Sequence, residues 1–175
     1  MANENNIAEI FGKVDAILSK VDLSKTTAES AGFEDLEQGY YLCEVLTAEL
    51  TESKKQDPQI KLTLSVVQDG VYFDEEDNMI ERPHSKGRRL YKYYPLKDEM
   101  TVKRFVSDML KFEDENGDPI LPQEAFTSAE TLSDALDVIT GMQVYVNLTV
   151  SGEKESRNTW ISLLAWSRVD DLGIK

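Results

Sequence analysis

The chain has 175 residues and a net charge of -14 at pH 7, with 41% hydrophobic and 30% charged residues. This length and balance predict one soluble globular domain with a substantial core. No apolar run approaches the roughly 20 residues that a membrane-spanning helix needs, and the first residues lack the basic and apolar regions of a signal peptide. We therefore expect a cytoplasmic protein without membrane association.

The cysteine and histidine counts argue against most catalytic and metal-binding devices. Cys43 is the only cysteine and His84 the only histidine, so an intrachain disulfide is excluded and a structural zinc site lacks ligands. A Ser-His-Asp or Cys-His device would have to use His84, which lies in a basic, tyrosine-rich segment. The acidic loop 113–120 departs from the calcium-loop pattern at Gly117 and Ala125. We expect no enzyme activity, no cofactor and no metal.

The clearest helix is predicted over residues 4–21. Its apolar residues recur at the spacing of one helical face, and they are Ile7, Ile10, Phe11, Val14, Ile17, Leu18 and Val21. Such a stripe packs either on the domain or on a partner chain, which makes it the candidate contact for a homo-oligomer. The predicted domains are an N-terminal amphipathic helix (1–24), a linker (25–38), a folded domain (39–170) and a short tail (171–175).

Three strands are predicted next. Residues 39–50 and 59–68 alternate between apolar and polar side chains, which predicts an antiparallel hairpin. Residues 69–86 have no sustained period and hold an acidic cluster, so we expect a long loop there, with a short hairpin at 71–73. A third strand follows at 88–95.

Two helices and two strands complete the domain. Residues 97–112 have the helical period, with Asp98 as the expected N-cap, and residues 128–141 form a second helix. The second helix carries a capping pattern that begins at Thr131. The last two strands are expected at 142–150 and 158–168.

This order of elements predicts an α+β fold built on a five-stranded antiparallel barrel of the OB type. The helical insertion would lie between strands 3 and 4, and the N-terminal helix would precede the barrel. A sandwich of the immunoglobulin type needs about seven strands, and a parallel α/β sheet needs strands and helices that alternate throughout.

Residues 82–94 reverse the charge of this acidic chain, because they contain five Lys or Arg and three Tyr but no Asp or Glu. Strand alternation places Arg89, Tyr91 and Tyr93 on one side, and OB-folds bind nucleic acids on strands 2 and 3. Single strands need cations for their phosphates and flat rings for their bases. Tyrosines also occur in strands simply because they fit a half-buried pleat. The predicted nucleic-acid-binding residues are Arg82, Lys86, Arg88, Arg89, Tyr91, Lys92 and Tyr93, with Lys54, Lys55 and Lys61 around the first hairpin and Lys154 and Arg157 in the last.

Several segments carry a family resemblance that covers about residues 36–168, namely "GYYLCEVLTAEL", "IKLTLSVVQDG", "GRRLYKYYPL", "TVKRFVSDML", "GMQVYVNLTV" and "NTWISLLAW". They resemble a family of phage-encoded proteins from replication and recombination modules that is grouped with OB-fold single-stranded-DNA-binding proteins. The resemblance implies a binder without sequence specificity that protects phage DNA in the host cytoplasm. Single-stranded DNA and phage or host replication and recombination proteins would be its partners. The chain lacks the long acidic tail of many such proteins, so recruitment through a tail is not expected.

The main alternative belongs to another class of function. A small acidic protein can present carboxylates at phosphate-like spacing and act as a DNA-mimic inhibitor, or it can serve as a protein-protein adaptor. A net charge of -14 suits that role. This alternative gives the basic segment at 82–94 no function.

Overall fold

The computed structural model describes residues 2–20, 36–152 and 158–174, and the chain divides into two compact units, residues 1–35 and 36–175. The first unit holds helix α1 (Ala2–Leu18), which confirms the predicted N-terminal helix. Its apolar stripe from Ile7 to Leu18 is solvent-exposed, with 44% to 63% of each large apolar residue accessible. This stripe is the most exposed run of apolar side chains in the described chain.

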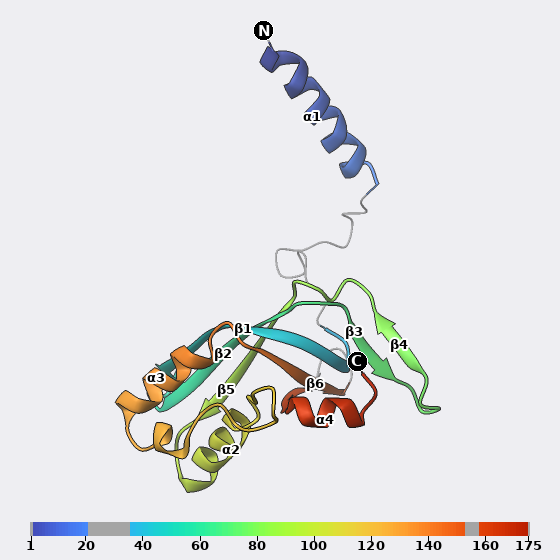
Figure 1. Cartoon of the computed structure of the whole chain (residues 1–175). Coiled ribbons are helices and arrows are strands. Elements are labelled where there is room, and N and C mark those ends of the chain that lie inside the picture. The colour runs from blue at the N-terminus through green and yellow to red at the C-terminus, as the bar shows by residue number, and fades with distance from the viewer. Residues whose placement is uncertain (1, 21–35, 153–157, 175) are drawn as a thin grey trace. The chain divides into compact units, whose positions relative to one another are not determined.

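The second unit is a mixed α+β fold built on seven antiparallel strands (Figure 1). The strands are β1 (Gly39–Glu52), β2 (Pro58–Val66), β3 (Gly70–Phe73), β4 (Met79–Arg82), β5 (Arg89–Pro95), β6 (Gln143–Ser151) and β7 (Asn158–Leu164). Five of them lie where the alternating pattern predicts strands. The prediction of β-rich α+β structure is therefore confirmed.

Strand β1 is the centre of the sheet. One edge of β1 pairs with β2 and then, at Tyr40, with β3, and its other edge pairs with β6 from Gly39 to Glu44. A β-bulge between Val45 and Thr47 interrupts the β1–β2 register. Bulges increase the local twist and bend a strand, so this irregularity lets one long strand serve both halves of the sheet.

The closed five-stranded barrel is not observed, because the sheet is open. Its strand order is β4-β3-β1-β2-β5, with β6 on the far edge of β1 and β7 beyond β6. Across the described residues no backbone pairing joins β5 to β7. A side chain bridges these two strands instead: Lys92 Nζ on β5 donates a hydrogen bond to the backbone oxygen of Ile161 on β7, at 2.7 Å.

The prediction of five strands is wrong in number because the loop 69–86 contains a second hairpin. Strands β3 and β4 have only four residues each, too few for a period to stand out. The predicted short hairpin at 71–73 is thus part of a real one, and the acidic cluster forms its turn. Asp74 Oδ1 accepts hydrogen bonds from the backbone N–H groups of Glu76 and Asn78, both at 2.9 Å, and so stabilises that turn.

The described residues of the second unit form three helices and a short 3-10 turn, Gln123–Phe126. They are α2 (Glu99–Met109), α3 (Ala129–Ile139) and α4 (Trp166–Asp171). Asp98 caps α2 as predicted, whereas α3 is capped by Ser128, with Thr131 completing its capping box. None of the helices in the described ranges is long and apolar enough to cross a membrane.

The final strand is shorter than predicted. It ends at Leu164 because residues 166–171 form α4, which buries Val169 against Leu42 and Tyr145. The Trp166 and Tyr145 rings pack edge to face, with their centroids 5.2 Å apart. This second, small core explains why the predicted strand gives way to a helix before residue 168.

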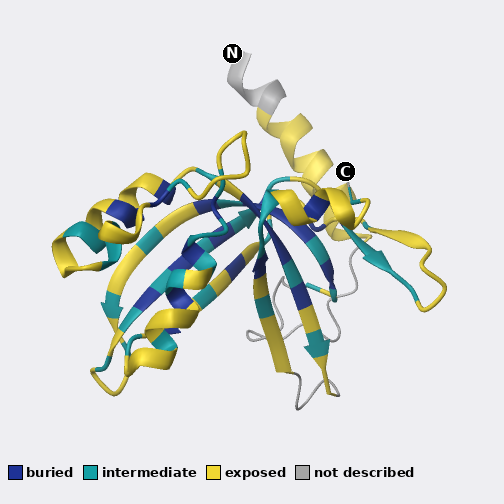
Figure 2. Ribbon diagram, turned by 60° about the horizontal axis from the view of Figure 1, so that its bottom comes forward, coloured by how far each residue is buried: buried dark blue, intermediate teal, exposed yellow. Residues whose placement is uncertain are grey.

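The main core lies on one face of the sheet, here called the inward face. Ile60, Leu62 and Leu64 of β2 are fully buried there, and Phe105 of α2 and Ile139 of α3 pack in the same cluster. Figure 2 shows the bands of buried and exposed residues along the strands. The opposite, outward face of β2 and β5 remains accessible to ligands.

Candidate nucleic-acid interface

The outward face of β5 carries two exposed tyrosines. Tyr91 is 46% and Tyr93 49% accessible, whereas Leu90 and Tyr94 are buried on the inward face. The alternation of strand residues puts neighbours on opposite faces, so the predicted register of this strand is confirmed. Arg89 is exposed on the same side as the two tyrosines.

Lys61 of β2 lies beside both rings. It pairs in register with Tyr93, and its Nζ lies 5.2 Å from the centre of the Tyr91 ring and 5.9 Å from the centre of the Tyr93 ring. Such cation-π contacts are worth about 0.5 to 1 kcal/mol each at exposed sites. One ammonium group therefore helps to fix the orientation of two aromatic rings. We call Lys61, Arg89, Tyr91 and Tyr93 the basic-aromatic strip.

The strip is bounded by acidic residues on β1. Glu49 lies opposite Lys61 in the β1–β2 register, and Glu44 lies opposite Ser65. The outward face is therefore cationic on β2 and β5 but acidic on β1. A polyanion can follow the first two strands and is repelled from the third.

The β1–β2 turn extends the strip at its Tyr93 end. A hollow of about 370 Å³ is lined by Tyr93 together with Lys54, Lys55 and Lys97. Ser53 holds the turn, since its Oγ accepts the N–H groups of residues 55 and 57, both at 3.2 Å. Lys97 forms an ion pair with Asp57 at 3.6 Å. Two exposed lysines thus lie next to the ring that ends the strip.

Two of the predicted binding residues are engaged elsewhere. Lys92 faces inward and is half-buried, where it bonds to the Ile161 carbonyl oxygen and lies 5.2 Å from the centre of the Tyr94 ring. Burial lowers the pKa of Lys92. Arg82 lies on β4. Its Nη1 forms an ion pair with Glu37 Oε2 at 2.7 Å, and its Cζ lies 4.5 Å from the centre of the Tyr72 ring. Neither cation lies on the outward face of β5. Alternation along the strand points Lys92 inward, and Arg82 lies on a different strand, β4.

The remaining predicted residues fall near the strip or outside the described ranges. Lys86 is exposed in the turn before β5, where its backbone N–H donates to Asp69 Oδ1 at 2.9 Å. Arg88 is half-buried and lies immediately before that strand. Lys154 and Arg157 lie outside the described residues.

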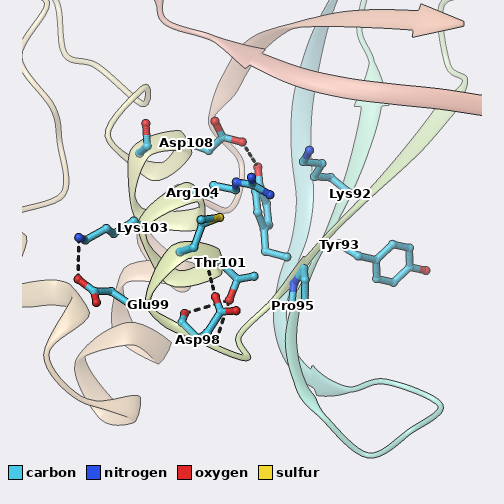
Figure 3. A pocket seen from close by; sticks show the side chains of 12 residues that line it. Lys92, Tyr93, Pro95, Asp98, Glu99, Thr101, Lys103, Arg104 and Asp108 are labelled. Carbon is cyan, nitrogen blue, oxygen red and sulfur yellow. Dashed lines mark hydrogen bonds and ion pairs between the residues drawn. The ribbon is translucent and has the colours of Figure 1, made fainter.

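A larger groove separates β5 from α2 (Figure 3). Its volume is about 860 Å³ and its lining mixes cations with acids. Inside it the Tyr94 hydroxyl donates to Asp108 Oδ2 at 2.7 Å, and burial together with the Asp108 charge raises the pKa of Tyr94. Lys111 bonds to the other oxygen of Asp108 at 2.7 Å. The Tyr93 ring points away from this groove, towards the outward face.

Cys43 and Asp114, two groups of a kind used in catalysis or metal binding, are engaged within the fold. Burial raises the pKa of Cys43 to about 12, so its thiol is protonated at neutral pH. Asp114 Oδ1 accepts the N–H groups of Asn116 and Asp118 at 2.8 and 3.1 Å and thereby caps its own loop. In the part of the chain that the structure describes, no three His, Cys, Asp or Glu residues are placed to hold a metal ion.

Two exposed residues near these strands were missed from the sequence. Lys97 lies two residues after Pro95, and its sequence position assigns it to the start of the following helix. In the structure it lines the hollow beside Tyr93. Trp160 is 55% exposed on β7, opposite Thr149. The alternation of the last strand, which buries Leu163, places Trp160 on the other side from Ile161 and could have identified it.

Comparison with known proteins adds no relative. No protein-family model matches the chain, and no curated protein sequence matches it significantly. The chemistry of the basic-aromatic strip is therefore the basis for assigning a function.

Proposed function

We propose that this protein binds single-stranded DNA without sequence specificity and that the basic-aromatic strip is the binding surface. The observation that carries the proposal is one ammonium, Lys61 Nζ, within 6 Å of the centres of two exposed tyrosine rings. The chain has a net charge of -14, so cations are outnumbered by acids over most of its length. Cations and aromatic rings gathered on one face therefore call for a functional explanation.

The chemistry of the strip matches what a single strand presents. Unstacked bases bind to Tyr91 and Tyr93 by stacking, and this is independent of sequence because every base has a flat π-face. Phosphates bind to Arg89, Lys61, Lys54 and Lys55, which lie along the strip and at its end. The acidic remainder of the surface repels polyanions and confines the strand to this path.

We also propose that the sheet is a partly open relative of the five-stranded OB arrangement. Strands β1, β2, β5, β6 and β7 follow the expected order, and α2 and α3 fall between β5 and β6 in the chain. The long β1 pairs on both edges, as a barrel requires. The bond from Lys92 to Ile161 spans the seam where backbone pairing would close the barrel.

A role in phage DNA replication or recombination belongs to the same proposal. Single strands are exposed when a duplex is copied or annealed, and a protein that covers them without reading sequence protects them. The rival role, a DNA-mimic inhibitor or adaptor, accounts for the net charge but not for two tyrosines and a lysine gathered on one exposed face.

Substitution of Tyr91 tests this function. Tyr91→Ala should weaken binding to an oligo-dT by about 1 to 3 kcal/mol, because one stacking platform is lost. Tyr72→Ala is the matched control, since Tyr72 lies on β3 and stacks on Arg82 instead. Fluorescence anisotropy measures both affinities. Equal affinities for the two variants would show that the strip does not contact the strand.

A further inference from the structure

The exposed apolar residues of α1 recur with the seven-residue repeat of a coiled coil. Ile7 and Val14 occupy one core position of a seven-residue repeat, and Ile10 and Ile17 occupy the other. Each of these four side chains is between 44% and 63% accessible. Such a strict repeat of β-branched residues is typical of a helix that pairs with other helices along a narrow seam.

We infer that α1 assembles with α1 of other copies of this chain into a parallel bundle of three or four helices. Three of the four core residues are isoleucine and the fourth is Val14; isoleucine at both core positions favours trimers and tetramers over dimers. Phe11 and Leu18 flank the seam and are 63% and 55% accessible. They widen the apolar stripe beyond what two helices can cover, which favours the same stoichiometry.

The area of the stripe agrees with this number of helices. Six half-exposed apolar side chains of about 100 Å² each give roughly 600 Å² per helix, or about 1,200 Å² for a pair, the lower limit for a stable interface. A third or fourth helix also covers Phe11 and Leu18 beside the seam and buries more of every chain. A pair alone is therefore marginal.

The charges next to the seam favour parallel copies. Lys13 flanks the core on the side of the helix opposite Phe11 and Leu18, and it forms an ion pair with Glu9 at 3.4 Å. An antiparallel arrangement of identical helices brings the flanking lysines of two copies together. A parallel arrangement places the Lys13 stem over Leu18 of the next helix, where its methylenes cover apolar surface.

The polar side of α1 supplies the matched control. Ala8 and Ala16 are exposed and lie off the seam, as does Gly12, around which a Cβ would meet no atom within 4 Å. Charges placed at Ala8 and Ala16 alter the helix as much as charges in the seam but leave the core intact. Gly12→Ala strengthens the helix itself by removing a poor helix former.

Sedimentation velocity on the full chain over the micromolar range tests the proposal without DNA. The wild type should have three or four times the 19.8 kDa mass of one chain, and Gly12→Ala should tighten the assembly. Ile10→Asp/Ile17→Asp should sediment as a monomer, with its self-association weakened at least about 100-fold because two charges per helix enter the core. Ala8→Asp/Ala16→Asp should assemble as the wild type does.

The result is independent of the proposed function, because oligo-dT binding by the second unit can be measured on the same variants. A wild-type mass of one or two chains would overturn the inference. So would an assembly that Ile10→Asp/Ile17→Asp leaves intact while the near-UV circular dichroism of the folded unit is unchanged.

Discussion

Neutralising the lysines at the β1–β2 turn should flatten the salt dependence of DNA binding. Four cations, Lys54, Lys55, Lys61 and Arg89, lie along the strip or at its end without an ion pair shorter than 4 Å in the described chain. Each phosphate contact on a single strand contributes about 0.7 to the slope of log K against log salt, so the wild-type slope should be about -3. Lys54→Gln/Lys55→Gln should reduce it to about -1.4.

The assay is a series of anisotropy titrations with labelled oligo-dT at increasing salt. A fourfold rise in salt should weaken the wild type about 50-fold and Lys54→Gln/Lys55→Gln about 7-fold. Lys20→Gln/Arg168→Gln removes the same net charge at two exposed sites outside the strip, the turn after α1 and helix α4, and should keep the wild-type slope. If both double variants have the same slope, the effect is one of total charge and the assignment of these lysines to the strip is wrong.

Three further predictions concern the framework. Lys92→Met should destabilise the second unit by about 1 to 2 kcal/mol in urea unfolding, because the Ile161 carbonyl loses its partner; an unchanged midpoint would show that the β5–β7 seam needs no bridge. Stability should fall as pH rises above 9, since burial raises the pKa of Cys43 to about 12 from its usual 9.0. The stabilisation from the protonated thiol is fully present below pH 9. From pH 9 towards pH 12 the free energy of unfolding falls by about 1.4 kcal/mol per pH unit. Cys43→Ala should lose about 1.4 kcal/mol less than the wild type between pH 8 and pH 10, and equal losses would contradict the burial argument. Deletion of residues 1–24 should leave a cooperative thermal transition but abolish self-association; loss of the transition would place α1 in the core.

Much of the sheet could be predicted because its alternation records burial directly. In β2, Ile60, Leu62 and Leu64 are buried and Lys61 and Thr63 are half-exposed, as the sequence pattern requires. The same alternation separates Tyr91 and Tyr93 from Tyr94, so the exposed rings of the candidate site can be identified from the sequence alone.

The features that the sequence did not predict depend on contacts between distant segments. Lys92 looks like any strand cation until β7 supplies the carbonyl of Ile161, 69 residues further along the chain. Arg82 looks like part of the strip in the sequence because no period marks the four-residue strand that holds it. The strand predicted over residues 158–168 ends at Leu164, and residues 166–171 form a helix instead, since Val169 packs with Leu42 and Tyr145.

Preference for single strands is the most direct test of the proposed DNA binding. Anisotropy titrations of the wild type should compare labelled oligo-dT with a duplex of equal length, each at low and high salt. We predict tighter binding to the single strand, because only unstacked bases reach Tyr91 and Tyr93, and a marked loss of affinity at high salt. No salt-dependent binding to oligo-dT at tens of micromolar protein, or equal binding to the duplex, would contradict it.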